Sequence, residues 1–201
     1  MNTQSSQFSR IALIILVSLY VLTIAGFSYA NWSADPQSTE WWMVVVNFVV
    51  LSIPLVLLYG SIYVLLIAWR ERTSLGQINP RLEKIIYWAP RIAAITIIIF
   101  VGLFSLDVFE EEASPFELLS GFLIHNIPSI VMLLLLIFAW KRPAVGFVAF
   151  LVVAILFALF FVRNLEMLPN LLLFVFPLLL IAGLFYADWK WLQPPDQAVT
   201  E

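Results

Sequence analysis

Six long apolar stretches separated by short polar segments dominate the chain. They are Ile11–Ala30, Trp41–Trp69, Ile92–Leu106 with its flanks, Phe116–Trp140, Val145–Val162 and Leu168–Tyr186. A bilayer needs about 20 apolar residues per spanning helix, and a helix satisfies its own backbone hydrogen bonds in lipid. The pattern therefore predicts an all-α membrane protein with six transmembrane helices. In the polar connection before the third span, we expect Pro80–Trp88 to form a short interfacial helix.

The composition supports a membrane protein and removes several kinds of chemistry. Of the 201 residues, 63% are hydrophobic and 11% are charged, and the mean hydropathy is +1.00. These values differ from those of soluble domains, and six spans with short loops fill residues 1–201 as a single domain. Cysteine is absent, which excludes disulfides and thiolate metal sites, and the net charge of -3 does not suggest a nucleic-acid partner. No cofactor is predicted.

The distribution of Lys and Arg predicts the orientation. With six spans and a cytoplasmic N-terminus, nine basic residues lie inside and one, Arg163, lies outside. The nine are Arg10, Arg70, Arg72, Arg81, Lys84, Arg91, Lys141, Arg142 and Lys190. Because cytoplasmic loops retain Lys and Arg, we expect both termini in the cytoplasm and a multi-pass protein of the cell membrane.

The first apolar stretch has a second interpretation, as a cleaved secretory signal. Ser28-Tyr29-Ala30 fits a small-residue cleavage site. The stretch is longer than the apolar region of about 7 to 15 residues in a signal peptide, and one basic residue precedes it. A retained helix is the expectation.

A weak internal repeat predicts how the spans pair. Ile53-Pro54 and Ile127-Pro128 each begin an apolar run that ends in Ala-Trp and a basic residue, and Phe176-Pro177 precedes Trp189-Lys190 in the same manner. Three parallel in-out-in hairpins are the simplest arrangement. The alternative is that lipid imposes similar residues on all spans.

One helical stripe in the fourth span is the main candidate site. At about 100° per residue, one sector holds Glu117, Gly121, Ile124, His125 and Pro128, with Ser120 at its edge, while Asn126 points the other way. Ionisable residues inside spans usually face protein or water and are functional candidates. His125 has two interpretations: a structural one, bonded to the second or third span, which we expect, and a functional one on a transport path.

The outer side carries a candidate ion pair. Arg163 should meet Glu117 or Asp107, because the fifth span delivers it to the surface where the third span ends and the fourth begins. The acidic run from Asp107 to Glu112 could bind a divalent cation, but it lacks the spaced ligands and Gly of a calcium loop. A solvated loop and no metal site are therefore expected.

About half of the chain, from Arg81 to Trp189, resembles a family of small uncharacterised bacterial and archaeal membrane proteins built on a four-helix domain. The residues that carry the resemblance are Trp88, Arg91, Leu106-Asp107-Val108-Phe109, Leu123-Ile124-His125-Asn126-Ile127-Pro128-Ser129, Ala139-Trp140, Pro143 and Gly146. The resemblance implies a four-helix part at 81–189, an added hairpin at 1–80 and a polar tail at 190–201. It implies no activity.

Enzyme chemistry has little support in this sequence. One His, no Cys and no paired intramembrane Asp argue against metal, thiol and aspartyl catalysis. We therefore expect a non-catalytic accessory or assembly bundle whose partners are the lipid bilayer and other membrane proteins or itself. The alternative is a small carrier or channel with His125 on the path. The two differ in whether Asn47, Ser52 and Tyr59 of the second span meet the stripe at a cavity.

Overall fold

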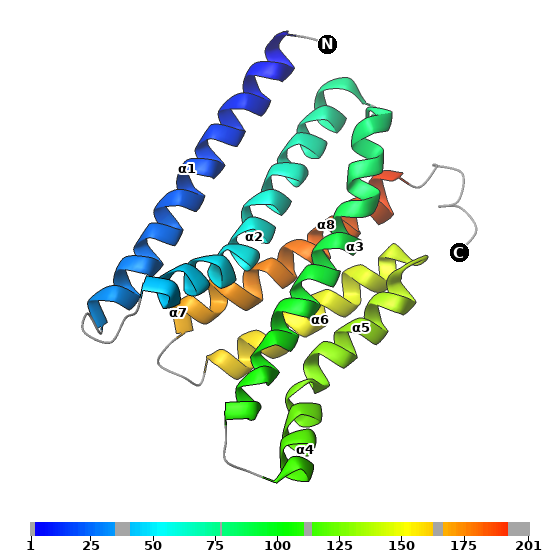
Figure 1. Cartoon of the computed structure of the whole chain (residues 1–201). Helices are drawn as coiled ribbons and strands as arrows, with labels where there is room; N and C mark the ends of the chain where they lie inside the picture. Colours follow the sequence, from blue (N-terminus) through cyan, green and yellow to red (C-terminus); the bar gives the residue numbers. More distant parts are fainter. Residues whose placement is uncertain (1–2, 35–40, 77, 111–113, 163–166, 193–201) are drawn as a thin grey trace.

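The protein is a bundle of helices in the computed structural model, which describes residues 3–34, 41–76, 78–110, 114–162 and 167–192 (Figure 1). No strand occurs among these residues. The α-helices are α1 Thr3–Ala34, α2 Trp41–Leu75, α3 Pro80–Leu103, α4 Pro115–His125, α5 Ile127–Ala139, α6 Pro143–Phe161, α7 Met167–Asn170 and α8 Phe176–Leu192. A 3-10 helix, η1 Phe104–Glu110, follows α3, and a π-helical turn, η2 Leu171–Val175, leads into α8.

Five helical segments of the described chain are long and apolar enough to cross a membrane. They are Gln7–Ala30, Val44–Ser74, Pro80–Leu106, Pro143–Phe161 and Leu171–Leu192. The pair α4 and α5 makes a sixth if it is counted as one bent span. The prediction of an all-α protein with several helices long and apolar enough to span a membrane is confirmed for the described residues.

The core lies among α3, α5, α6 and α8. The closest packing is between α6 and α8, where the Phe150 and Phe185 rings stack at 5.6 Å between centroids. Gly146 permits this approach, because an added Cβ would lie 2.6 Å from Cδ1 of Phe185. Ile97 of α3 and Leu136 of α5 close the same core from the other side.

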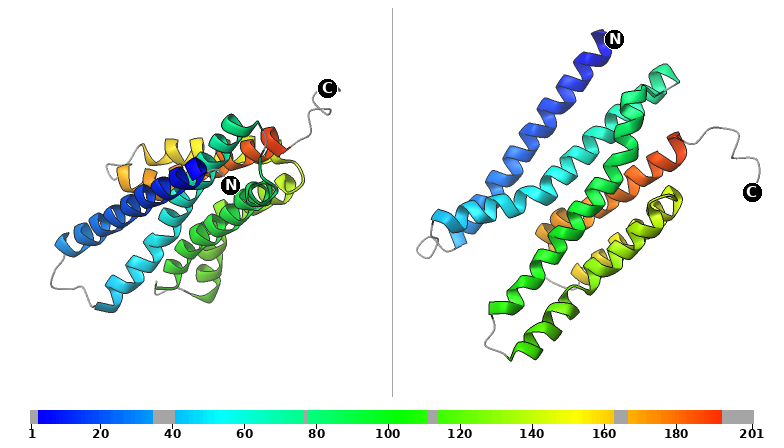
Figure 2. Two further views of the ribbon diagram at one scale, coloured as in Figure 1. Left: turned by 90° about the horizontal axis from the view of Figure 1, so that it is seen from above. Right: turned by 45° about the vertical axis from the view of Figure 1, so that its right-hand side comes forward.

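Helix α1 lies at the edge of the bundle alongside α2 (Figure 1; Figure 2, right). Hydroxyl groups join the two helices. Tyr20 donates to Ser52 Oγ at 2.9 Å, and Thr23 Oγ1 shares a hydrogen bond of 2.7 Å with Tyr59 OH. Interhelical hydrogen bonds of this kind hold membrane helices together where lipid supplies no hydrophobic drive.

The predicted interfacial helix at Pro80–Trp88 is wrong as a separate element, because α3 runs without a break through Pro90. Buried positions continue at helical spacing on both sides of this proline, from Leu82 and Ile86 to Ala94 and Ile97. Packing of that stripe against the core holds the helix together where the missing N–H of Pro90 would otherwise weaken it.

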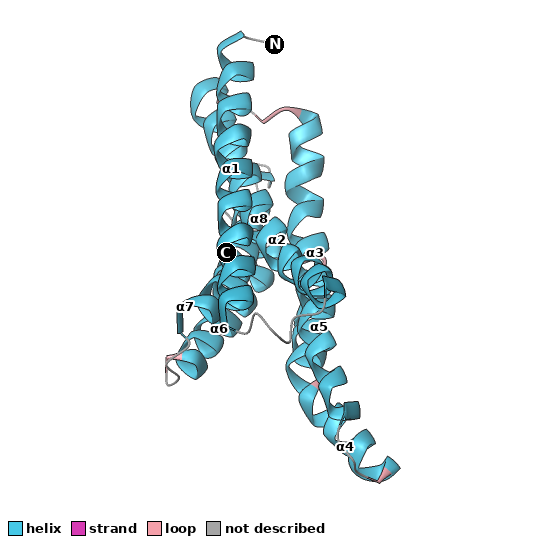
Figure 3. Cartoon of the chain, turned by 60° about the vertical axis from the view of Figure 1, so that its left-hand side comes forward, coloured by secondary structure: helices cyan, strands magenta, loops and turns pink. Residues whose placement is uncertain are grey.

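The predicted fourth span is not one straight helix. It bends by 46° between α4 and α5, and in Figure 3 α4 continues away from the bundle at this point. Pro128 has no N–H to donate to the carbonyl of Ile124, so the helical ladder is interrupted there. Asn126 sits at the junction, with its N–H on the carbonyl of Phe122 and its carbonyl accepting from Ile130 N–H.

Candidate functional site

The candidate stripe borders an apolar cavity of about 380 Å³. Elements α3, η1, α4, α5, α6 and η2 all contribute to its wall. The lining residues are Val101, Phe104, His125, Pro128, Leu156, Phe157, Phe160, Phe161 and Phe174. His125 is the one ionisable side chain among them. The cavity can therefore hold an apolar body with one polar contact.

His125 bonds within its own helix. Its Nδ1 lies 2.9 Å from the carbonyl oxygen of Gly121, and the side chain is exposed. The expected bond to the second or third span is therefore wrong. Its neighbour Asn126 instead bonds to Ser105 of η1, and because successive helical residues point about 100° apart, the two side chains meet different neighbours.

The bond to Gly121 determines which atom of His125 is available at the cavity. A carbonyl oxygen only accepts, so Nδ1 must carry the hydrogen of this bond. In the neutral ring, Nε2 then has a lone pair and no hydrogen. His125 can accept a hydrogen bond from a hydroxyl group that enters the cavity.

The other members of the stripe make contacts within α4, with its N-cap or with η1. Glu117 forms a capping box with Ser114, in which Glu117 Oε2 accepts from Ser114 N–H at 2.9 Å. Ser120 Oγ donates to the carbonyl of Phe116 at 2.7 Å. Gly121 packs against Val108 of η1, since an added Cβ would lie 2.8 Å from its Cγ1. Of the predicted stripe, His125 and Pro128 reach the cavity and Glu117, Ser120 and Gly121 do not.

A small polar cluster at the α4–α5 junction was not predicted. Asn126 Nδ2 donates to Ser105 Oγ at 2.5 Å, and Ser105 Oγ donates to the carbonyl of Gly102 at 2.6 Å. Ser129 Oγ is buried nearby, 3.5 Å from the place that a Cβ on Gly102 would occupy. These contacts fasten the bend to the end of α3. The direction of Asn126, opposite to His125, was the signal that could have indicated them.

The second unpredicted feature is a buried ion pair between α3 and α8. Arg91 NH1 donates to Asp188 Oδ2 at 2.7 Å, and both side chains are almost fully enclosed. A carboxylate inside an apolar span needs a partner, because an isolated buried charge is costly. Asp188 follows the predicted apolar run Leu168–Tyr186 by two residues and lies within the apolar helical segment Leu171–Leu192, so it was the sequence signal.

Arg91 also binds the end of α5. Its Nε and NH2 donate to the carbonyl of Trp140 at 3.3 and 2.8 Å, NH1 also contacts the carbonyl of Tyr87, and the guanidinium lies 3.7 Å from the centre of the Tyr87 ring. A cation at a helix C-terminus satisfies carbonyls that lack helical partners. Arg91 thus joins α3, α5 and α8.

Several predicted groups lie outside the described residues. Arg163 is one, and the side chains of Asp107 and Asn47 are others, so the outer ion pair of Arg163 with Glu117 or Asp107 stays a prediction. Within the described ranges, no three His, Cys, Asp or Glu side chains gather as a metal site requires.

The four-helix core corresponds to a family unit. Residues 79–196 match the family described as a domain of unknown function, DUF7670. The chain belongs to the DUF7670 family. The match agrees with the resemblance to an uncharacterised family over 81–189. The DUF7670 segment contains the His125 cavity, the Asn126 cluster and the Arg91–Asp188 pair, whereas α1 and α2 precede it. Among curated proteins and among solved structures, no match to the chain was found.

Proposed function

We propose that this protein is a non-catalytic six-helix bundle that serves as an accessory or assembly partner of other membrane proteins or of itself. In this proposal it resides in a prokaryotic cell membrane as three in-out-in hairpins, with both termini in the cytoplasm. The basic residues at the ends of the described spans support this orientation, because Lys and Arg are retained on the cytoplasmic side.

The hydrogen-bond partners of the polar side chains of α2 are the main support for the proposal. Ser52 and Tyr59 bond to α1, and His125 bonds to its own helix. A transport path would need such groups to converge on one cavity. In the described chain, Ser52 and Tyr59 instead join α2 to α1, and the bond of His125 stays within α4.

The cavity beside His125 favours a second candidate, a small carrier. Its volume of about 380 Å³ lies within the range of about 300–1,000 Å³ that small-molecule pockets occupy. A carrier would use His125 Nε2 as its polar contact.

Flux measurements separate these two functions. The purified protein would be placed in liposomes, and proton and ion flux would be recorded for the wild type, His125→Gln and His125→Leu. The accessory function predicts flux no greater than in protein-free liposomes. If the wild type shows flux, and both substitutions abolish it without lowering the melting temperature, the carrier function is supported and the accessory function is contradicted.

Photo-crosslinking in native membranes tests the assembly role directly. A photoreactive residue at the exposed position Leu22 of α1 should crosslink to one reproducible membrane protein that also co-purifies with the chain. The same probe at Phe150, which is fully buried in α6, is the control. Crosslinks to lipid alone, with no co-purifying protein or second copy, would oppose the accessory function.

A further inference from the structure

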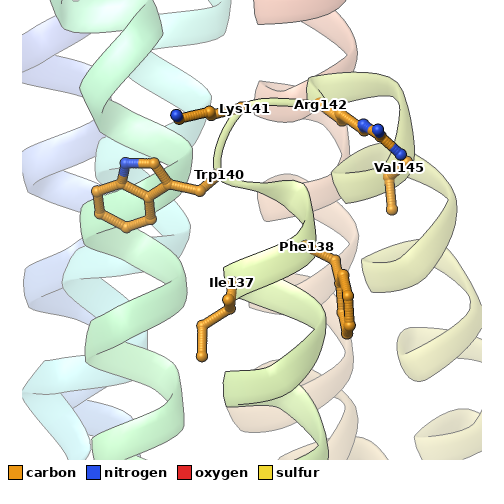
Figure 4. A pocket seen from close by; sticks show the side chains of 6 residues that line it. All are labelled: Ile137, Phe138, Trp140, Lys141, Arg142 and Val145. Atoms are coloured by element: carbon orange, nitrogen blue, oxygen red, sulfur yellow. The ribbon is translucent and has the colours of Figure 1, made fainter.

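The turn between α5 and α6 borders a pocket with a charged rim and an apolar wall. Its volume is about 720 Å³, and its lining residues are Ile137, Phe138, Trp140, Lys141, Arg142 and Val145. In Figure 4, Lys141 and Arg142 extend from the turn in opposite directions, while Phe138 lies between the two helices below them. The pocket thus combines two cations with apolar surface directly beneath.

Among the residues that the structure describes, no side chain neutralises the positive charge of this turn. Lys141 and Arg142 are exposed, and among the described residues no carboxylate lies within 4.0 Å of either. Helix α6 starts at Pro143 without a side-chain cap. Its N-terminal end therefore adds partial positive charge at the same place.

The turn is held in position by the core. Arg91 fixes the carbonyl of Trp140 through two donated hydrogen bonds, of 3.3 and 2.8 Å. The Trp140 ring packs edge-on against Trp88 at 6.3 Å. A ligand at this turn meets groups that are already ordered, which lowers the entropic cost of binding.

The apolar part of the pocket determines which anion fits. Ile137 and Phe138 are 60% and 68% exposed and lie on the last turn of α5, directly before the basic turn. A free phosphate would make no apolar contact with Ile137 and Phe138. An acyl chain would cover them while its headgroup meets Lys141 and Arg142, and interfacial Trp residues lie at headgroup level.

We propose that this pocket binds the headgroup of an anionic phospholipid, with its acyl chains along Ile137 and Phe138. Lys141 and Arg142 attract the negative headgroup from opposite sides of the turn, and the N-terminal end of α6 contributes to the same field. The proposal does not depend on the accessory function, because a carrier could hold the same lipid.

Lipid titration by native mass spectrometry tests this site. The full chain would be titrated with phosphatidylglycerol in a neutral detergent, with phosphatidylcholine as reference. Each cation close to the bound headgroup contributes about a fivefold gain in affinity for anionic lipid, so Lys141→Gln with Arg142→Gln should weaken binding about 30-fold. The matched control is Arg10→Gln with Arg81→Gln, which also removes two exposed cations, neither of which lines the pocket. This control should change the affinity for phosphatidylglycerol by less than about threefold.

Further measurements distinguish a lipid from a soluble anion and allow for misfolding of the double variant. Phe138→Ala should weaken phosphatidylglycerol binding, while glycerol phosphate at equal concentration should not raise the melting temperature of the wild type. If the double variant fails to fold, Lys141→Gln and Arg142→Gln are measured singly, each with an expected loss of about fivefold.

Three results would overturn the proposal. Equal losses in the pocket variant and the control variant would mean diffuse surface attraction. An unchanged affinity in the pocket variant would place the lipid elsewhere. Stabilisation by glycerol phosphate equal to that by phosphatidylglycerol would mean a site for soluble anions.

Discussion

Arg91 of α3 and Asp188 of α8 form an ion pair at 2.7 Å although 97 residues separate them in the chain. The same guanidinium holds the final carbonyl of α5, so one side chain connects three of the four core helices. Each of the three guanidinium nitrogens has a defined acceptor, and this geometry suits Arg better than Lys. The pair therefore fixes the positions of α3, α5 and α8 at one end of the bundle.

Removing one member of this pair should cost more than removing both. Asp188→Ala leaves a buried guanidinium without its carboxylate and should lower the free energy of unfolding by about 3–5 kcal/mol. Arg91→Met combined with Asp188→Leu fills the space with apolar groups and should lose less. Unfolding in detergent with increasing denaturant would measure both. A double variant that loses as much free energy of unfolding as Asp188→Ala, or more, would show that the two side chains are not coupled in this way.

Gly146→Ala should destabilise the α6–α8 contact. The new Cβ would lie 2.6 Å from Cδ1 of Phe185, a fully buried ring stacked on Phe150. Overpacking of this kind costs about 1–3 kcal/mol of unfolding free energy. Gly60→Ala in α2 is the control, because no atom lies within 4 Å of its added Cβ, and a change of no more than about 0.5 kcal/mol is expected. Equal melting temperatures of the two variants would contradict the steric argument.

Apolar segment length was sufficient to predict the spans but not their interruptions. The apolar runs predicted where long apolar helices lie, since lipid restricts the length and composition of each span, but α3 begins already at Pro80 and α2 continues to Leu75. They did not determine that α3 continues through Pro90 while the fourth span bends near Pro128. A proline removes one hydrogen bond in both places, and packing of the surrounding helices decides whether the axis bends.

The sequence identified His125 as unusual but not its partner. A helical sector specifies which residues share a face, and it does not specify which neighbouring helix that face meets. The Arg91–Asp188 pair was missed for the same reason, because it depends on how α3 and α8 pack. Arg91 was counted only as a basic loop residue, although it is 1% exposed.

Single-cysteine labelling should test the orientation. The chain contains no Cys, so one Cys placed at Ser38 or at Gln77 reports one loop without background. We expect a membrane-impermeant maleimide to label Ser38→Cys in intact cells and Gln77→Cys only after lysis, because the loop near Gln77 lies among basic residues. Labelling of Gln77→Cys in intact cells would reverse the orientation.

Adjacent residues at the α4–α5 junction should respond differently to substitution. Asn126 makes an interhelical hydrogen bond to Ser105, whereas His125 bonds to a carbonyl of its own helix and faces the cavity. Asn126→Leu should therefore lower the free energy of unfolding by about 1 kcal/mol, the magnitude of a polar contact between membrane helices, and His125→Leu by less than about 0.5 kcal/mol.

Coupling to Ser105 makes this comparison specific. Once Ser105→Ala has removed the acceptor, Asn126→Leu should cost little more, while any effect of His125→Leu should be unaltered because His125 does not touch that hydroxyl. Denaturant unfolding of the single and double variants in one detergent would give the coupling energies. A loss for His125→Leu as large as that for Asn126→Leu would mean that His125 has an interhelical partner, and the polar contact assigned to the cavity would have to be given up.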